Sequence, residues 1–279
     1  MSTKDKLTGV FSRHAEAYRS RLDEWMAKGQ AAGRDTILDY VKPRPGMRIL
    51  DLACGPGTLT IPMASELNGS GEVVGIDLAQ GMLDTARAAL AGRSLPVRFL
   101  RMDIESLQFP LASFDAATCG HGLHFLPNFG RALAGVRRVL KNRARFAASL
   151  PGPDRGGPDA PGALLAAAFD ARLGKSEAPP ELARTRALVA DLDQLSHAAL
   201  AAGFRIAEAE TVAVEVTWDS PVHFVTVQAN WWANARRLEG LSEHVRELVL
   251  KEAADQLEKS LGGGPFTTTD TANVLRAEV

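Results

Sequence analysis

The stretch ILDLACGPGT, which runs from Ile49 to Thr58, joins a short apolar run to a loop that contains two glycines. The apolar run is typical of a buried strand, and the segment TLTIPMASEL that continues from the loop is typical of a helix. Gly55 and Gly57 let the backbone approach a ligand closely at the start of that helix, where amide groups are unpaired. The stretch therefore predicts a strand, a glycine loop and a helix that form a cradle for a nucleotide.

The chain around this cradle alternates between strands and helices. Apolar segments of strand type are followed by helical segments several times in succession, which is typical of βαβ units and a parallel sheet. We expect an α/β fold, a doubly wound, Rossmann-like and mostly parallel sheet of seven strands, with the carboxyl ends of the parallel strands on one edge. The predicted strands cover residues 47–53, 71–77, 97–103, 114–120, 143–150, 204–218 and 271–279.

Helical segments stand outside the predicted sheet. Apolar residues between Leu7 and Met26 recur at spacings of three and four, which predicts one amphipathic helix. The chain is helical in pattern again from Pro221 to about Leu261. We expect three parts: a helical lid at residues 1–42, a nucleotide-binding domain at 43–220 with 265–279, and a helical insertion at 221–264 that caps the substrate.

Composition limits the classes of partner. The 279 residues carry a formal net charge of −1 and 46% of them are hydrophobic, so we expect a globular core and no basic face for nucleic acid. No apolar run approaches the roughly 18 residues that a membrane span needs, and the N-terminus lacks the apolar core of a signal peptide. Cys54 and Cys119 do not make a disulfide framework. These features predict a cytoplasmic protein.

Two acidic residues and a threonine in place of a third glycine limit the kind of nucleotide that the cradle can bind. Asp77 ends the second predicted strand, 20 positions after Gly57, where a carboxylate can accept from both ribose hydroxyls. Thr60 occupies the position of a third glycine, and Asp51 places a negative charge inside the first strand. A charge there favours a cationic ligand and repels a pyrophosphate.

Four segments in this order carry a family resemblance: ILDLACGPGTLT, VVGIDLAQGML, FLRMDIESLQF and FDAATCGHGLHFLPN. They resemble successive motifs of the class I S-adenosylmethionine-dependent methyltransferases, and most of all the UbiE/COQ5-like branch that acts on small molecules. The resemblance covers residues 11 to 150 well and the C-terminal half only in general layout. It implies S-adenosylmethionine as cofactor, S-adenosylhomocysteine as product, and no metal.

The resemblance also implies roles for the matching positions. Asp51 would hold the amino group of the cofactor's methionine, Asp77 would take the ribose hydroxyls, and Asp103 would accept from the adenine amine. The N-terminal segment FSRHAEAY resembles the part that closes over the cofactor, which makes Tyr18 a contact. The remaining implied cofactor contacts are Gly55, Gly57, Leu78, Met82, Ile104, Cys119 and Gly120.

Candidates for catalysis and substrate binding follow the fourth strand and lie in the helical segments. His121 or His124 can act as a general base, because a histidine of near-neutral pKa can take a proton from a hydroxyl, an indole or an activated carbon. Aromatic residues can stack on a flat acceptor. The candidate substrate contacts are Trp25, Phe125, His223, Trp231 and Trp232.

The sequence as a whole predicts a methyltransferase that acts on a small, rather apolar metabolite, such as a secondary metabolite or a quinone-like molecule. The acceptor atom stays open between carbon, oxygen and nitrogen, and so does the oligomeric state, with a homodimer among the options. One alternative is a protein that uses the cofactor structurally or hosts a non-methylating reaction such as a cyclisation. A second alternative is an NAD-dependent oxidoreductase, which the missing glycine and Asp51 disfavour.

Overall fold

The computed structural model describes residues 3–153, 156–176 and 179–279, apart from the side chain of Trp232. The chain divides into two compact units. The first, called the sheet unit, comprises residues 1–153, 179–213 and 271–279, and the second, called the helical unit, comprises residues 154–178 and 214–270. In the described part of the chain, no helix combines the length and the hydrophobicity that a membrane crossing needs.

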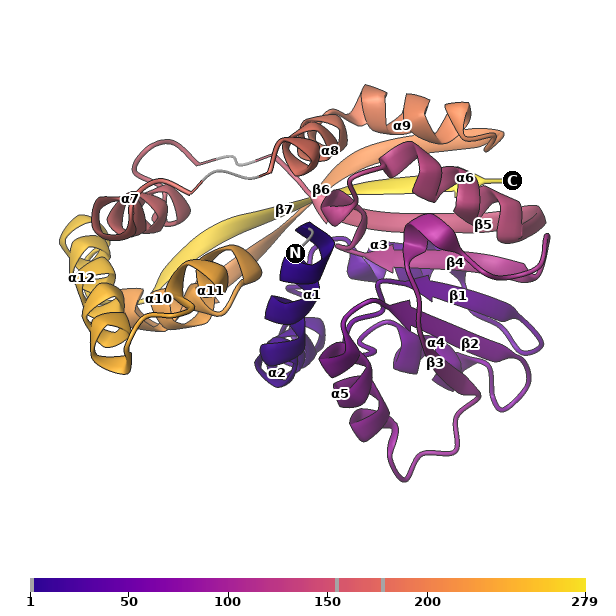
Figure 1. Ribbon diagram of the computed structural model, residues 1–279, viewed down its shortest axis with the longest axis horizontal. Coiled ribbons are helices and arrows are strands. Elements are labelled where there is room, and N and C mark those ends of the chain that lie inside the picture. The colour runs from indigo at the N-terminus through magenta and orange to yellow at the C-terminus, as the bar shows by residue number, and fades with distance from the viewer. Residues whose placement is uncertain (1–2, 154–155, 177–178) are drawn as a thin grey trace. The chain divides into compact units, whose positions relative to one another are not determined.

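The described residues form a seven-stranded sheet in the order β3-β2-β1-β4-β5-β7-β6 (Figure 1). Strands β1 to β5 pair in parallel, and β7 runs antiparallel to β5. This confirms the expected α/β class and the mostly parallel sheet. The strands are β1 Arg48–Leu52, β2 Glu72–Asp77, β3 Val97–Arg101, β4 Phe114–Gly120, β5 Leu140–Pro151, β6 Ile206–Trp218 and β7 Phe266–Glu278.

The strand order reverses at β1, and this reversal positions the site. Strand β1 lies between β2 and β4, and Asp51 is paired in register with Gly75 on one side and Thr118 on the other. Helix α4 (Thr60–Glu66), which follows β1, and helix α6 (Phe129–Val139), which follows β4, cover opposite faces of the sheet, so a crevice forms at the carboxyl ends of β1, β2 and β4. Ligands of open α/β sheets bind in that crevice.

Helices cover both faces of the sheet. On one face, α3 (Arg34–Val41) and α4 (Thr60–Glu66) contribute Ile37 and Met63 to a fully buried cluster, and α5 (Gln80–Leu90) packs beside them. On the other face, α6 (Phe129–Val139) and α9 (Leu192–Ala201) bury Val136 and Leu195, with α8 (Pro180–Ala190) next to α9. Each of these helices presents one apolar side to the strands, so the sheet becomes the centre of the core.

The N-terminal region forms two helices, α1 (Thr3–Arg13) and α2 (Ala15–Ala27). The expectation of one continuous helix from Leu7 to Met26 is wrong at His14, whose ψ of 12° departs from helical geometry and ends α1. Helix α1 lies very close to the start of α5, since a Cβ atom on Gly81 would stand 2.3 Å from the backbone oxygen of Ser12. Tertiary packing of α1 on α5 therefore outweighs the helical periodicity.

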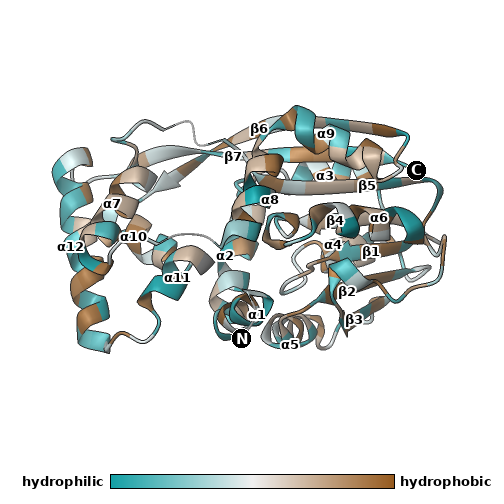
Figure 2. Ribbon diagram, turned by 45° about the horizontal axis from the view of Figure 1, so that its top comes forward, coloured by the Kyte–Doolittle hydropathy of each residue, from teal (hydrophilic) through white to brown (hydrophobic). Residues whose placement is uncertain are grey.

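The helical unit is built from α7 (Pro161–Leu173), α10 (Pro221–Ala229), α11 (Trp232–Leu238) and α12 (Glu243–Leu261). Helix α12 contacts both α7 and α10, and a salt bridge of 2.8 Å joins Arg237 to Asp170. Figure 2 shows hydrophobic and hydrophilic residues side by side along α12, as expected of a helix with one buried side. The unit combines the expected insertion with α7 and with parts of β6 and β7.

Candidate functional site

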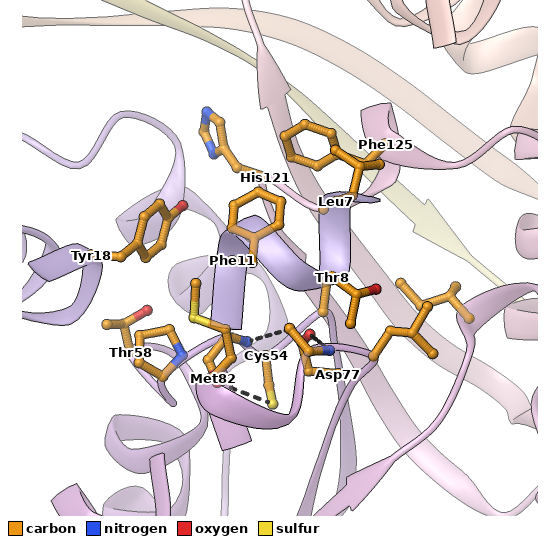
Figure 3. A pocket seen from close by; sticks show the side chains of 18 of the residues that line it. Leu7, Thr8, Phe11, Tyr18, Cys54, Thr58, Asp77, Met82, His121 and Phe125 are labelled. Carbon is orange, nitrogen blue, oxygen red and sulfur yellow. Dashed lines mark hydrogen bonds between the residues drawn. The ribbon is translucent and has the colours of Figure 1, made fainter. Parts of the chain in front are cut away.

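A cavity opens at the carboxyl ends of β1, β2 and β4, and all of its lining residues belong to the sheet unit. Its empty volume is about 880 Å³, counting the part that is open to solvent. Figure 3 shows how side chains of α1, α2 and the glycine loop gather around it. The sequence-predicted site residues that line it are Tyr18, Gly55, Asp77, Leu78, Met82, Asp103, Ile104, Gly120, His121 and Phe125.

The glycine loop and the end of β2 are joined by one carboxylate. Oδ2 of Asp77 accepts from the backbone amide of Gly55 at 2.9 Å, and Oδ1 accepts from the amide of Ala79 at 2.8 Å. Gly55 has a φ of +53° and only the sulfur of Met82 within 4 Å of a Cβ position, so its backbone stays open to a ligand. Burial raises the pKa of Asp77, and the two amides oppose that rise.

Asp51 lies behind the cavity wall rather than on it. Its carboxylate accepts from the hydroxyl of Thr60 at 2.5 Å and from that of Thr118 at 2.8 Å, and the residue is 1% exposed. Burial raises the pKa of Asp51 to about 6, while the threonines and the charge of Arg34 lower it. Asp51 is absent from the lining, so its predicted contact with the cofactor would run through another group.

The segment after β3 is tied to the N-terminal helix. Oδ1 of Asp103 accepts from the amide of Glu105 at 3.0 Å and begins a short 3₁₀ helix, η1 (Ile104–Ser106). Nζ of Lys4 in α1 lies 2.6 Å from Oδ2 of Asp103 and also bonds Glu105. These two carboxylates raise the pKa of Lys4 although burial opposes them. The salt bridge fixes α1 over this end of the cavity.

Aromatic rings close the other side of the cavity. Phe11 of α1 lies edge-on to Phe125 at a centroid distance of 5.3 Å and edge-on to Tyr18 at 6.2 Å. All three residues line the cavity, and Figure 3 shows their rings around its mouth. Such surfaces favour a flat, apolar ligand.

His121 lies directly after β4 and borders the cavity. Its backbone has a φ of +57°, and its ring atom Nδ1 lies 2.8 Å from the hydroxyl of Ser149 on β5. Burial and the charge of Arg34 lower the pKa of His121 well below its ordinary value, with a smaller effect from His124. The imidazole is therefore neutral at pH 7, which is the state that can accept a proton, but it is a weaker base than the near-neutral histidine that the sequence predicts.

Several predicted site residues lie away from the cavity lining. His124 is 5% exposed, its ring lies 3.9 Å from that of Phe125 at a tilt of 42°, and its pKa is lowered to about 3 by burial and by Arg186. Gly57 packs into the core, because a Cβ atom there would stand 3.3 Å from both Ile61 and Phe99. Burial also raises the pKa of the Cys119 thiol to about 12. Trp25 is half-buried in α2.

The predicted substrate residues of the C-terminal half belong to the helical unit. His223 lies in the first turn of α10 beside Trp218, at a ring distance of 5.8 Å, and its Nδ1 atom lies 3.2 Å from a carboxylate oxygen of Asp219. Trp231 precedes α11, and the side chain of Trp232 lies outside the described residues. Their predicted role stays a prediction.

The cavity is also bordered by two cationic residues that the sequence patterns did not single out. Lys4 precedes the first apolar position of α1, and Arg34 begins α3. Basic residues at helix ends usually face solvent, so local sequence offered no signal for Lys4. For Arg34, the preceding Gly33 was the one local hint of a tight turn.

Comparisons with known proteins show the family of the chain. A family model described as "Methyltransferase domain" matches residues 49–143. A 2-phytyl-1,4-naphtoquinone methyltransferase of Trichormus variabilis is 32% identical over 146 residues, which is 51% of this chain and 63% of that protein. Aklanonic acid methyltransferase DauC of a Streptomyces species is 32% identical over 152 residues, 54% of this chain and 67% of that protein.

A solved structure shares the fold. The YcgJ protein of Bacillus subtilis superimposes with a TM-score of 0.56 at 18% identity, over 88% of this chain and 97% of that one. The chain belongs to the S-adenosylmethionine-dependent methyltransferases, as the motifs of its first half predicted. It spans about 63% of the length of the naphthoquinone methyltransferase it matches.

Proposed function

We propose that the protein transfers the methyl group of S-adenosylmethionine to a small, rather apolar acceptor. One observation carries this proposal: the carboxylates of Asp77 and Asp103 and the open backbone of Gly55 border one cavity. A nucleoside needs acceptors for its ribose hydroxyls and for its adenine amine, and these residues provide both kinds. The acceptor groups of the cavity thus match the donor groups of the nucleoside part of the cofactor.

The cofactor side of the site is assigned as follows. Each Asp77 oxygen has a lone pair left after its bond to an amide, so the carboxylate can accept from the ribose. Ile104 and Met82 give the adenine ring apolar contacts, and Asp103 accepts from its amine. Asp51 acts indirectly, because it is 1% exposed and does not line the cavity. Bound S-adenosylmethionine supplies an activated methyl group on a sulfonium, and no metal takes part.

On the acceptor side, His121 is proposed as the general base. In the tautomer that donates from Nδ1 to Ser149, the lone pair lies on Nε2, which can take a proton from a hydroxyl or an enol. Phe11 and Phe125 orient a flat acceptor and exclude water. Orientation of this kind lowers the activation barrier of the transfer by several kcal/mol. His124 is proposed to support Phe125 and His121 rather than to touch the acceptor.

Two observations suggest the class of acceptor: the names of the relatives, and the aromatic rings of Phe11, Tyr18 and Phe125 at the cavity. One relative is named for a naphthoquinone and another for aklanonic acid. Flat, conjugated, oxygen-rich molecules would pack against the surface that Phe11 and Phe125 form together. We therefore propose a quinone-like or aromatic polyketide acceptor. We also propose a cytoplasmic location for the enzyme. Whether it forms a homodimer can be measured by light scattering.

The test begins with cofactor binding. Calorimetry with S-adenosylhomocysteine should show binding to the wild-type protein, and Asp77→Asn should weaken it by at least about tenfold, since a charged acceptor is lost. Asp84→Asn is the matched control, because Asp84 pairs with Arg87 on the exposed surface of α5. Equal affinities of Asp77→Asn and wild type would contradict the assignment.

The transfer itself is tested on products. Hydroxynaphthoquinones and anthraquinone carboxylic acids would be incubated with the protein and S-adenosylmethionine. Mass spectrometry should detect a gain of about 14 Da in the acceptor and an equal amount of S-adenosylhomocysteine. A product of unchanged mass, formed only when the cofactor is bound, would support the cyclisation alternative instead.

A further inference from the structure

Lys4 places an ammonium group beside the carboxylate of Asp103 in the wall of the cavity. Its Nζ atom lies 2.6 Å from Oδ2 of Asp103, and both residues line the cavity. They are 99 positions apart in the chain, so only the position of α1 brings them together. The pair presents a hydrogen-bond donor next to an acceptor on one wall.

The neighbouring carboxylate of Glu105 holds the pair in place. Glu105 bonds Lys4 through Oε2, and its Oε1 atom accepts from the backbone amide of Asn128, the N-cap of α6, at 2.5 Å. The backbone amide of Glu105 donates to Oδ1 of Asp103 at 3.0 Å. Only 12% of the Glu105 side chain and 24% of the Lys4 side chain are exposed. The donor and the acceptor are therefore fixed relative to each other before a ligand binds, which favours binding.

Helix α1, which carries Lys4, is fastened near both of its ends. Oγ1 of Thr3 donates to Oε1 of Glu181 in α8 at 2.7 Å. Towards the other end, the backbone amide of Gly81 in α5 donates to the hydroxyl of Ser12 at 3.3 Å. Two distant elements thus hold the helix from which Lys4 reaches the cavity.

Both members of the pair keep capacity for a ligand. An ammonium group has three N–H donors, and Asp103 and Glu105 take two of those of Lys4. On Asp103, Lys4 and the amide of Glu105 each use one lone pair of a different oxygen. Burial disfavours the charge of Lys4, but the bonds to the two carboxylates outweigh it and raise the pKa of Lys4. The amine is therefore protonated, and remains a donor, at neutral pH.

This donor and acceptor match one edge of adenine. The exocyclic amine of adenine is a donor, and a ring nitrogen that accepts stands next to it, N7 on one side and N1 on the other. A carboxylate beside an ammonium group is the complementary arrangement, because the carboxylate accepts from the amine and the ammonium donates to the ring nitrogen. Guanine carries an oxygen in place of the amine, so Asp103 would repel it.

We propose that Lys4 binds the cofactor by donating to the ring nitrogen beside the adenine amine, N1 or N7, while Asp103 accepts from that amine. This inference rests on the proposed function, which places the adenine at Asp103. It adds to that site a base-reading residue from α1, a helix outside the strand ends that carry the cofactor motifs. The adenine then lies against α1 as well as against η1.

The experiment removes one ring nitrogen of the ligand at a time. S-adenosylhomocysteine and its 1-deaza, 7-deaza and 3-deaza analogues, in which a C–H group replaces the nitrogen, are titrated into the wild-type protein by calorimetry. The 1-deaza or the 7-deaza analogue should bind about tenfold more weakly than the parent, because a hydrogen bond from a charged donor is lost. The analogue that loses affinity identifies the nitrogen. N3 lies across the ring from the amine, so the 3-deaza analogue is the control ligand.

Variants then assign the loss to Lys4. Lys4→Met keeps the aliphatic length and removes the donor, so the sensitive analogue and the parent should bind within about twofold of each other. Lys4→Arg retains a charged donor of different shape and should keep part of the difference. Lys6→Met, at an exposed position of the same helix, is the matched control and should keep all of it. Any effect of the 3-deaza change should be the same in every variant.

Two results would overturn the inference. One is wild-type protein that binds the 1-deaza and 7-deaza analogues as tightly as the parent, a result that does not depend on how any variant folds. The other is a loss of affinity that persists in full in Lys4→Met, since another donor would then contact that nitrogen. Wild-type protein that binds neither the parent nor any analogue is a different outcome, because it contradicts the proposed function and this inference with it.

Discussion

The ring atom Nδ1 of His121 lies 2.8 Å from the hydroxyl oxygen of Ser149 on the neighbouring strand β5. The same two residues are joined through the backbone, since the amide of His121 donates to the carbonyl of Ser149 at 2.9 Å. Ser149 is fully buried and sits opposite Gly120 in the register of β4 and β5. The sheet therefore holds the histidine at the cavity by two bonds.

Ser149→Ala should reduce turnover without affecting the cofactor. The imidazole loses the partner that selects its tautomer, so kcat should fall by about tenfold or more if His121 is the base. The affinity for S-adenosylhomocysteine should stay within about twofold. The pH–rate profile should also shift, which a purely structural role would not cause. Ser65→Ala, whose hydroxyl bonds within α4, serves as the control, and unchanged kcat in Ser149→Ala would contradict the role of His121.

Thr118→Val should destabilise the protein. The substitution keeps the shape of the side chain and removes one of the two hydroxyl donors to the buried Asp51. An unsatisfied buried acceptor costs about 1–3 kcal/mol, which urea unfolding can measure. Thr118→Ser retains the donor and should lose much less. A loss in Thr118→Ser with none in Thr118→Val would show that the methyl packing, and not the hydrogen bond, is what Thr118 contributes.

Gly33→Ala should destabilise the sheet unit more than Gly29→Ala. Both glycines have positive φ, +78° and +65°, so an alanine is strained at either position. Only at Gly33 would the new methyl group collide with neighbours, at 2.9 Å from Val274, whereas Gly29 has open space. Thermal unfolding should therefore separate the two by about 1–3 kcal/mol. Equal shifts in melting temperature would mean that the start of α3 can move away from β7.

Stability should fall in mild acid because of His124. Burial lowers its pKa from 6.5 to about 3 in the folded protein, so the unfolded chain binds the proton more readily between these values. The stabilisation is complete above pH 6.5 and decreases as the pH falls towards 3, by about 1.4 kcal/mol for each pH unit at most. Urea unfolding of His124→Leu from pH 7 to 5 should show a flatter curve than the wild type. Parallel curves would show that His124 is protonated to the same extent in both states.

The carboxylates and the glycine loop of the cavity could be predicted because their signals are local. A strand that ends in Asp77, a glycine loop with Gly55, and Asp103 after the next strand are each read from a few consecutive residues. Parallel strands bring their carboxyl ends to one edge of the sheet, so these side chains meet around one cavity.

The position of Asp51 relative to the cavity depends on longer-range contacts. Its bond to Thr118 joins residues 67 positions apart, and the bond depends on the register of β1 and β4. The break between α1 and α2 at His14 lies where the end of α1 approaches Gly81 of α5, an element far along the chain. Periodicity predicts which side of a helix is apolar, and a distant element decides where the helix ends.

The sequence by itself determined the family, the order of strands along the chain and the carboxylates of the cavity, because strand ends and glycine turns are local features. Only the tertiary structure decided that Asp51 is enclosed by two threonines and that the buried Nε of Arg34 has no acceptor among the residues the structure describes. The physical reason is that burial and charge pairing depend on which strands and helices become neighbours. A lone arginine at the start of a helix has no sequence pattern that distinguishes a solvated charge from one enclosed in a cavity wall.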